Sequence, residues 1–193
     1  MDHLVADLLD ALARLDAVTM ERIVALRSPL ATKLLTSATG LGSATAALVF
    51  VGLCYLAGWE KEGRQAAVAL ALSGVVVGTL MLTIQRPYPP QPVCLTGGAG
   101  TVASSFPSGH AAAVTVYAMT ARRSDVLPFG VVALLAGAIA FSRVYLGTHY
   151  LTDTVVGVGI GLAAFLLAAW LLQREDVRAL EVRVRTAVGS VLR

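Results

Sequence analysis

Long apolar stretches, separated by short polar segments, run through most of the chain. Five of them stand out, at about residues 43–58, 65–85, 106–121, 126–141 and 151–172. A helix needs about 20 residues to cross the hydrocarbon core of a bilayer, so the second and fifth stretches have full length and the others are shorter. The pattern predicts an all-α protein, a multi-pass transmembrane bundle of about five spans.

The first 26 residues have a different pattern. Apolar residues recur there at helical spacing, with charged residues between them: Leu4, Val5, Leu8, Leu9, Leu12 and Leu15, against Asp2, Asp7, Asp10, Arg14 and Asp16. This pattern indicates an amphipathic helix with too many charges to span, so we expect it to lie on the membrane surface or to cap the bundle. We therefore predict an amphipathic N-terminal helix over residues 1–29, a membrane helical domain over 30–173 and a basic cytoplasmic tail over 174–193.

Two predicted spans carry glycines four residues apart. Gly74 and Gly78 lie in the second span, and Gly157 and Gly161 lie in the fifth. Small residues at this spacing let helix backbones approach closely in lipid. Both pairs are predicted to be sites of close helix packing.

Composition and charge favour the membrane interpretation. Hydrophobic residues make up 56% of the chain and charged residues 14%, whereas soluble domains have about 25% charged residues. The net charge is only +3, and the basic residues form no stripe of the kind that binds nucleic acid. The composition thus excludes an ordinary soluble domain, and no nucleic-acid partner is expected.

The distribution of basic residues predicts an orientation. The side of the membrane that the second span reaches holds only Arg86 and Arg143 in its loops, and four basic residues before the first span are ambiguous. The opposite side holds Lys61, Arg64, Arg122, Arg123, Arg174, Arg178, Arg183, Arg185 and Arg193. Positively charged loops stay in the cytoplasm, so the first side is predicted to face away from it, at the cell membrane.

Three polar segments are expected to meet on that outer face. They are residues 85–90 after the second span, 105–110 at the start of the third, and 142–153 between the fourth and fifth. Spans of alternating direction bring all three segments to one side. Titratable groups beside spans are costly and tend to mark function, so this face is the candidate site.

The segment at the start of the third span has the features of an anion-binding helix start. Ser105 is predicted to cap the helix and Pro107 to occupy its first position. The amides of Ser108, Gly109 and His110 would then point out of the helix start, where anions bind readily. His110 at its rim is able to give a proton.

The segment between the fourth and fifth spans combines a nucleophile with an orienting group. His149 and Asp153 are four residues apart and share one face of a helix. A carboxylate bonded to one imidazole nitrogen fixes the tautomer and leaves the other nitrogen free to attack. Arg143, six residues before His149, offers a planar donor fork suited to phosphate oxygens.

These residues resemble two signature motifs of the type 2 phosphatidic acid phosphatase family, whose fold is shared with vanadium haloperoxidases. The motifs are Phe106-Pro107-Ser108-Gly109-His110 and Ser142-Arg143, five residues, His149, three residues, Asp153. The resemblance covers about residues 30 to 172. It implies His149 as nucleophile, Asp153 as its orienter and His110 as the acid for the leaving alkoxide. It also implies phosphate ligands, without metal or cofactor: Arg143, the Ser108 hydroxyl and the Gly109 amide.

The first motif of that family is degenerate here. The family pattern is a lysine, six residues and Arg-Pro; if Arg86-Pro87 is that pair, Thr79 stands at the lysine position. In the other register, Tyr88 takes the place of the arginine and Met81 that of the lysine. Arg86 is predicted to swing into the site as a further phosphate ligand. Losing one cationic donor typically costs about 10² to 10³ in rate, so a weakened enzyme is expected.

Taken together, the residues and the resemblance predict an integral membrane lipid phosphatase. It would hydrolyse a phosphate monoester or pyrophosphate of a lipid, of phosphatidic acid or isoprenyl phosphate type, through a phosphohistidine intermediate. Its partners would be the lipid substrate and membrane lipids. The alternative is a non-catalytic lipid-phosphate-binding protein derived from such an enzyme. A vanadate-dependent peroxidase fits poorly because those relatives are soluble, and a transporter would carry charges midway through its spans.

Overall fold

A computed structural model describes residues 2–90, 92–93 and 104–174, so nearly all of the predicted C-terminal tail lies outside the described residues. The described part is helical and, as predicted, contains no strand. Its elements are α1 (Asp2–Ala25), α2 (Pro29–Thr39), a 3-10 turn η1 (Gly40–Gly42), α3 (Ala44–Leu56), α4 (Glu60–Thr83), α5 (Gly109–Arg122), α6 (Phe129–Tyr145) and α7 (Leu151–Leu171).

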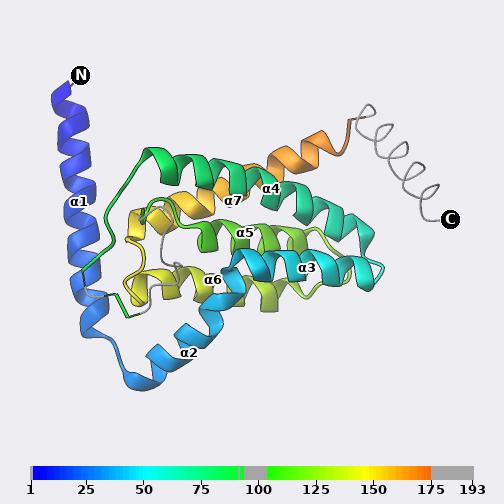
Figure 1. Cartoon of the computed structure of the whole chain (residues 1–193), viewed down its shortest axis with the longest axis horizontal. Coiled ribbons are helices and arrows are strands. Elements are labelled where there is room, and N and C mark those ends of the chain that lie inside the picture. Colours follow the sequence, from blue (N-terminus) through cyan, green and yellow to red (C-terminus); the bar gives the residue numbers. More distant parts are fainter. Residues whose placement is uncertain (1, 91, 94–103, 175–193) are drawn as a thin grey trace.

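Helices α3 to α7 form a bundle around α5 (Figure 1). Helix α5 packs against α4, α6 and α7, and its small side chains are almost all buried between them. The aromatic ring of Tyr117 on α5 contacts that of Phe50 on α3, with 4.6 Å between the ring centroids. The bundle thus has its core at the helix that begins with the predicted anion-binding segment.

The apolar helices match the five predicted stretches, with differences at their ends. Two of them, α4 and α7, are long and apolar enough to cross a membrane by themselves. A third span arises if α2, η1 and α3 are counted as one helix pair bent by 61°, and α6 is a shorter apolar helix of 17 residues. The protein is therefore a helical membrane bundle, and the number of five spans stays a prediction.

Helix α2 was not expected, because the first predicted apolar stretch begins only at residue 43, and Arg27-Ser28-Pro29 ends the preceding helix. These residues also begin a new helix: the Ser28 hydroxyl accepts a hydrogen bond from the Ala31 amide at 3.3 Å, and Pro29 holds the first helical position. The bend that follows lies directly on α5. A Cβ atom at Gly42 would be 2.9 Å from Cδ2 of His110, so only glycine fits there.

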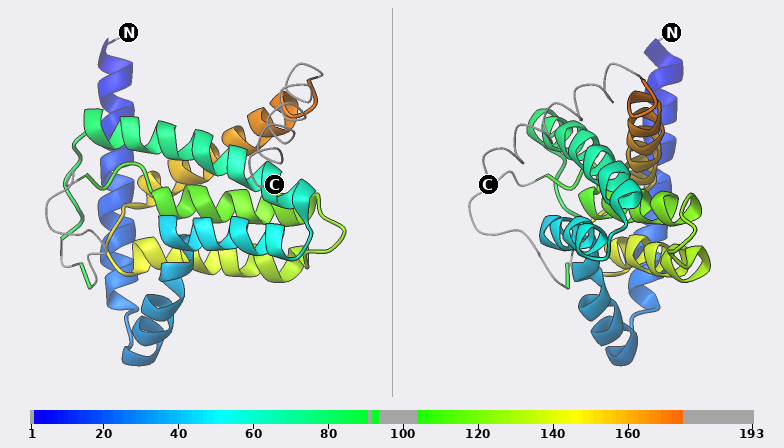
Figure 2. Two further views of the ribbon diagram at one scale, coloured as in Figure 1. Left: turned by 45° about the vertical axis from the view of Figure 1, so that its right-hand side comes forward. Right: turned by 90° about the vertical axis from the view of Figure 1, so that its right-hand side faces the viewer.

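Helix α1 runs across the end of the bundle rather than along it (Figures 1 and 2). Its predicted apolar stripe does not pack on the protein, since Leu4, Leu8 and Leu9 are 73%, 58% and 60% exposed. The side of α1 that the bundle buries carries instead Asp16 and Met20. Amphipathic spacing located the helix correctly, but it did not identify the face that contacts the protein.

One of the two predicted glycine pairs makes a close helix contact. A Cβ atom at Gly157 would lie 2.4 Å from the Ser108 carbonyl oxygen, and one at Gly161 would lie 2.4 Å from the Ala112 carbonyl oxygen. The prediction is confirmed for this pair, which seats α7 against the start of α5. It is wrong for Gly74 and Gly78, because a Cβ atom at either position meets no described atom within 4 Å.

Replacing Gly161 by alanine is therefore expected to destabilise the protein. The added methyl group collides with helix backbone, and overpacking of this kind typically costs about 1–3 kcal/mol. The midpoint of thermal unfolding in detergent measures the effect. Gly74→Ala is the matched control, because the same methyl group meets open space there. Equal midpoints for the two variants would contradict the close α5–α7 contact.

Candidate active site

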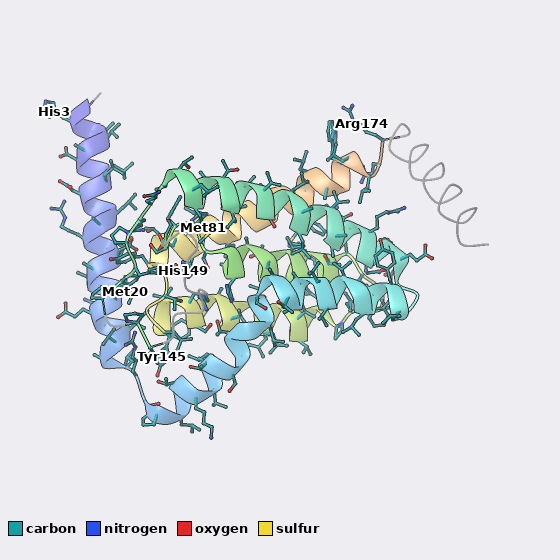
Figure 3. The ribbon with its side chains drawn as sticks, viewed as in Figure 1. His3, Met20, Met81, Tyr145, His149 and Arg174 are labelled. Atoms are coloured by element: carbon teal, nitrogen blue, oxygen red, sulfur yellow. The ribbon has the colours of Figure 1, made fainter. Side chains whose placement is uncertain are left out.

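The three polar segments meet at the end of the bundle beside α1, where His149 lies; Arg174 marks the opposite end (Figure 3). Backbone hydrogen bonds join the segments. The Ser105 amide donates to the Arg86 carbonyl at 2.8 Å, and the Ser108 amide donates to the Asp153 carbonyl at 3.0 Å. Stretches of chain up to 67 residues apart are thereby held in one place.

The imidazole of His149 is held in one tautomer. It lies in the turn between α6 and α7 and is 5% exposed, and its Nδ1 is 2.5 Å from the carbonyl oxygen of Ser105. A carbonyl oxygen only accepts, so Nδ1 carries the proton. Burial and the charge of Arg143 lower the pKa of His149 to about 3, against the raising effect of the Ser105 hydrogen bond. The ring is thus neutral near pH 7, with a lone pair on Nε2.

Asp153 is close to His149 but does not form the hydrogen bond that the sequence predicted. Its Oδ2 is 4.0 Å from Nδ1 of His149, beyond hydrogen-bond distance. That oxygen accepts instead from the Tyr150 amide at 2.8 Å, at the start of α7. The Ser105 carbonyl therefore takes the place expected for the carboxylate, whose charge still lies beside the ring. This corrects the partner of the imidazole, while the orienting role of Asp153 stays a prediction.

The start of α5 differs from the prediction by a few residues. Ser108 is the N-cap, not Ser105, and its hydroxyl accepts from the Ala111 amide at 3.4 Å. The Ser108 amide is engaged by Asp153, which leaves Gly109 and His110 as the first two helical residues with amides at the helix start. The groups available to bind an anion at this helix start are therefore these two amides and the Ser108 hydroxyl, without the Ser108 amide.

Two basic side chains, His110 and Arg143, accompany His149 and Asp153 in the site. The imidazole of His110 lies within electrostatic reach of both Arg143 and His149. Arg143 is buried, and its Nη1 donates to the hydroxyl of Thr39 at 2.9 Å. Its carbonyl accepts from the amides of Thr148 and His149 at 3.1 Å each. The structure thus brings together His110, Arg143 and His149, as the sequence predicted for these positions.

Arg86 has carboxylate neighbours, which the sequence did not predict. Its Nη1 lies 2.5 Å from Asp153 Oδ1 and 2.8 Å from the Thr152 hydroxyl, and its Nη2 lies 2.7 Å from Asp16 Oδ2. The guanidinium also stacks over the Tyr150 ring, 4.0 Å from the centroid. Burial alone would lower the pKa of Arg86, but the two carboxylates outweigh burial and raise it. Its predicted task as a phosphate ligand stays a prediction.

Thr79, at the lysine position of the degenerate first motif, lies on α4. Its side chain is exposed, and its hydroxyl donates to the Val75 carbonyl of its own helix at 2.9 Å. A threonine hydroxyl that bonds the preceding turn in this way brings no positive charge to the site. The departure from the family pattern is therefore a real loss of one cation.

Sequence reasoning missed three residues that hold the site together. Thr39 contacts Arg143 from the unexpected helix α2, Asp16 contacts Arg86 from α1, and Ser105 contacts His149 through its backbone. Ser28-Pro29 is a typical helix start, so it could have predicted α2, the helix that carries Thr39. Nothing in the sequence distinguishes Asp16 from the exposed acids of α1.

This fold and this cluster define a class: a helical membrane protein with a buried, neutral histidine beside an arginine and a helix start. Comparison with known proteins identifies the family. Residues 62–176 match the model of the PAP2 superfamily, and the chain belongs to that superfamily. The resemblance seen in the sequence is thereby confirmed. The family match begins in α4 and does not include α1, α2 or α3.

Individual relatives agree with this assignment. A decaprenylphosphoryl-5-phosphoribose phosphatase of Mycobacterium tuberculosis is 36% identical over 103 residues, 53% of this chain and 55% of that protein. Phosphatidylglycerophosphatase B of Bacillus subtilis is 43% identical over 74 residues, 33% of this chain and 36% of that protein. The match thus spans about half or less of these curated relatives.

Two solved structures have the same fold. A transmembrane PAP2-type phosphatidylglycerolphosphate phosphatase from Bacillus subtilis superimposes with a TM-score of 0.71 at 22% identity, over 82% of this chain and 85% of that one. LpxE of Aquifex aeolicus superimposes with a TM-score of 0.67 at 23% identity, over 78% of this chain and 92% of that one. The first of these structures is described as transmembrane, which agrees with the helical membrane bundle described above.

Proposed function

We propose that the protein is an integral membrane phosphatase that hydrolyses a phosphate monoester or pyrophosphate of a lipid through a phosphohistidine intermediate. The observation that carries this proposal is the state of His149. The ring is buried and neutral, and its Nδ1 proton is directed to the Ser105 carbonyl, so Nε2 keeps its lone pair for attack. Membership of the PAP2 superfamily supports the same chemistry.

In the proposed reaction, His149 Nε2 attacks phosphorus and the bond from phosphorus to the lipid oxygen breaks. His110 gives a proton to the departing alkoxide. Arg143, the Ser108 hydroxyl and the Gly109 amide hold the phosphate oxygens, where fixed donors stabilise the charge that develops. Water then attacks the phosphohistidine, His110 takes a proton from it, and inorganic phosphate leaves with His149 restored.

The substrate is proposed to be a phosphorylated lipid of phosphatidic acid or isoprenyl phosphate type. Of the two curated relatives described above, one is named a decaprenylphosphoryl-5-phosphoribose phosphatase and the other a phosphatidylglycerophosphatase, so their names include an isoprenyl lipid and a glycerolipid. The residues proposed to hold phosphate contact only the phosphate group, so they accept either lipid. No cofactor or metal enters the proposed steps.

The site is proposed to face away from the cytoplasm at the cell membrane. Helix α1 contacts the start of α7 at the site end, which assigns Arg14 and Arg22 to that side. Even with all four basic residues before the first span counted there, that side holds six against nine on the other. The basic excess still favours a cytoplasmic position for the opposite side and for the tail at 174–193. We further propose that the exposed apolar stripe of α1 lies in the lipid interface.

Trapping of the intermediate tests the proposed function. Purified protein is mixed with phosphatidic acid or a prenyl phosphate labelled in the phosphate group, quenched in alkali and digested. We expect a labelled peptide that carries phosphate on His149, because phosphohistidine survives alkali. Phosphate release without such a peptide would contradict the histidine route. Binding of lipid phosphate with neither release nor label would favour the non-catalytic binder, which the loss of the first-motif lysine at Thr79 alone suggests.

A further inference from the structure

Asp16 is an unusual residue for its helix. The other charged residues of α1 whose side chains the structure describes are exposed, while Asp16 is 1% exposed, and both of its carboxylate oxygens are engaged by groups outside α1. Oδ1 accepts from the Thr152 amide at 3.0 Å. Oδ2 accepts from the Thr152 hydroxyl at 2.5 Å and from Arg86 Nη2 at 2.7 Å. A buried carboxylate is stable only when it is paired and hydrogen-bonded in this way.

The contacts of Asp16 lead to the proposed nucleophile. Thr152 is the second residue of α7, so the carboxylate of Asp16 lies at the start of that helix, where negative charge is favourable. Arg86 joins Asp16 to Asp153, and Asp153 lies 4.0 Å from Nδ1 of His149. The chain of contacts thus runs from a surface helix, through one guanidinium, to the carboxylate beside the imidazole.

The charges of Asp16, Arg86 and Asp153 indicate a role for Asp16 in the reaction. Attack by His149 on phosphorus leaves positive charge on the imidazole, which a negative Asp153 stabilises. Arg86 by itself would cancel the charge of Asp153. A second carboxylate on the same guanidinium keeps the cluster of Asp16, Arg86 and Asp153 negative overall. The planar guanidinium of an arginine has donors on separate nitrogens, so it can bond two carboxylates at once.

We propose that Asp16 is a positioning residue for the reaction: it holds Arg86 against Asp153 and preserves the negative charge beside His149. This inference rests on the proposed phosphatase function. It assigns a part of the site to α1, which lies outside the segment that matches the family. It also gives Arg86 a task that does not require contact with phosphate.

Steady-state kinetics with a short-chain phosphatidic acid test the proposal. Asp16→Asn keeps the shape and removes the charge, and it is expected to lower kcat about 10- to 100-fold, the range found for residues that orient the ligands of metal sites. KM should change less than about twofold, because phosphate contacts are intact. Asp10→Asn is the matched control: it removes the same charge from an exposed position of α1 and should leave both constants unchanged.

A double substitution shows whether Asp16 acts through Arg86. If it does, Asp16→Asn adds no further loss in an Arg86→Gln background, since contacting residues are not additive. If the thermal midpoint shows that Asp16→Asn does not fold, Arg86→Lys carries the test. A lysine keeps the charge but cannot span both carboxylates, so kcat should fall again with KM unchanged.

The remaining outcomes show whether the positioning role, the proposed function or both are wrong. Unchanged kcat in Asp16→Asn, or independent losses in the double variant, overturns the positioning role of Asp16. A rise in KM for Arg86→Lys or Arg86→Gln with kcat unchanged overturns it too, and assigns Arg86 to phosphate binding instead. A wild-type protein that forms no phosphohistidine overturns the proposed function and this inference with it. An active wild type with an unaffected Asp16→Asn variant overturns the inference alone.

Discussion

Replacing His149 by glutamine is expected to abolish phosphate release, with a fall in kcat of about 10⁴-fold or more, the scale on which removal of a nucleophile acts. Glutamine keeps polarity and approximate size but offers no nitrogen lone pair to phosphorus. The loss should appear in kcat with little change in lipid binding, because the phosphate ligands stay in place. Release of inorganic phosphate from short-chain phosphatidic acid measures it, and the His149 phosphopeptide should vanish as well.

His3→Gln is the matched control for this substitution. His3 is exposed near the free end of α1, far from the bundle and from His149 (Figure 3), and the same change there should leave the rate intact. Equal rates for His149→Gln and the wild type would refute histidine catalysis. The protein would then have to be interpreted as a lipid-phosphate binder or as an enzyme with another nucleophile.

The helices of the bundle were predictable because their signal is long and repeated. The stretches at 65–85 and 151–172 correspond to α4 (Glu60–Thr83) and α7 (Leu151–Leu171). Each is an apolar run of about 20 residues, the length that crosses a bilayer. The start of α5 was harder. Proline at a first helical position is only a preference, and the structure begins this helix at Gly109, two residues after Pro107.

The residue types of the site were predictable, but the partners that fix them were not. An imidazole, a carboxylate and a guanidinium are visible in the sequence at His149, Asp153 and Arg143. The partner of His149 is a backbone carbonyl, that of Ser105, and every residue carries such a group. Only the fold decides which carbonyl meets the ring. The carboxylate that sequence spacing assigned to the ring caps α7 instead.

The pairing of Arg86 with Asp16 shows the same limit over a longer distance. The two residues are 70 positions apart, and one of them lies in a helix whose other described acidic side chains are exposed. Helical periodicity describes which residues share a face, but not which face another element covers. For Arg86, the family pattern suggested phosphate, whereas the structure supplies two carboxylates. A charged residue in a degenerate motif is therefore better interpreted from its neighbours than from the motif.

Arg143→Lys is the second substitution with a large expected effect, a fall in kcat/KM of about 10² to 10³ for phosphate release. Arg143 is buried, and one of its terminal nitrogens donates to Thr39, so the planar group is held at a fixed angle near His110 and His149. A lysine keeps the charge, but its three donors share one flexible nitrogen, so it cannot reproduce the planar fork that reaches Thr39 and two phosphate oxygens from separate nitrogens.

The chain also makes this loss harder to compensate. The family pattern has a lysine and an arginine in the first motif. In this protein Thr79 stands at the lysine position and carries no charge, and two carboxylates engage Arg86. Arg143 is therefore expected to carry most of the positive charge that meets the phosphate. Arg22→Lys, at an exposed position of α1, is the matched control and should retain the wild-type rate. If kcat/KM of the Arg143→Lys variant falls by less than about threefold, other residues hold the phosphate. Arg86 is then the first alternative to test.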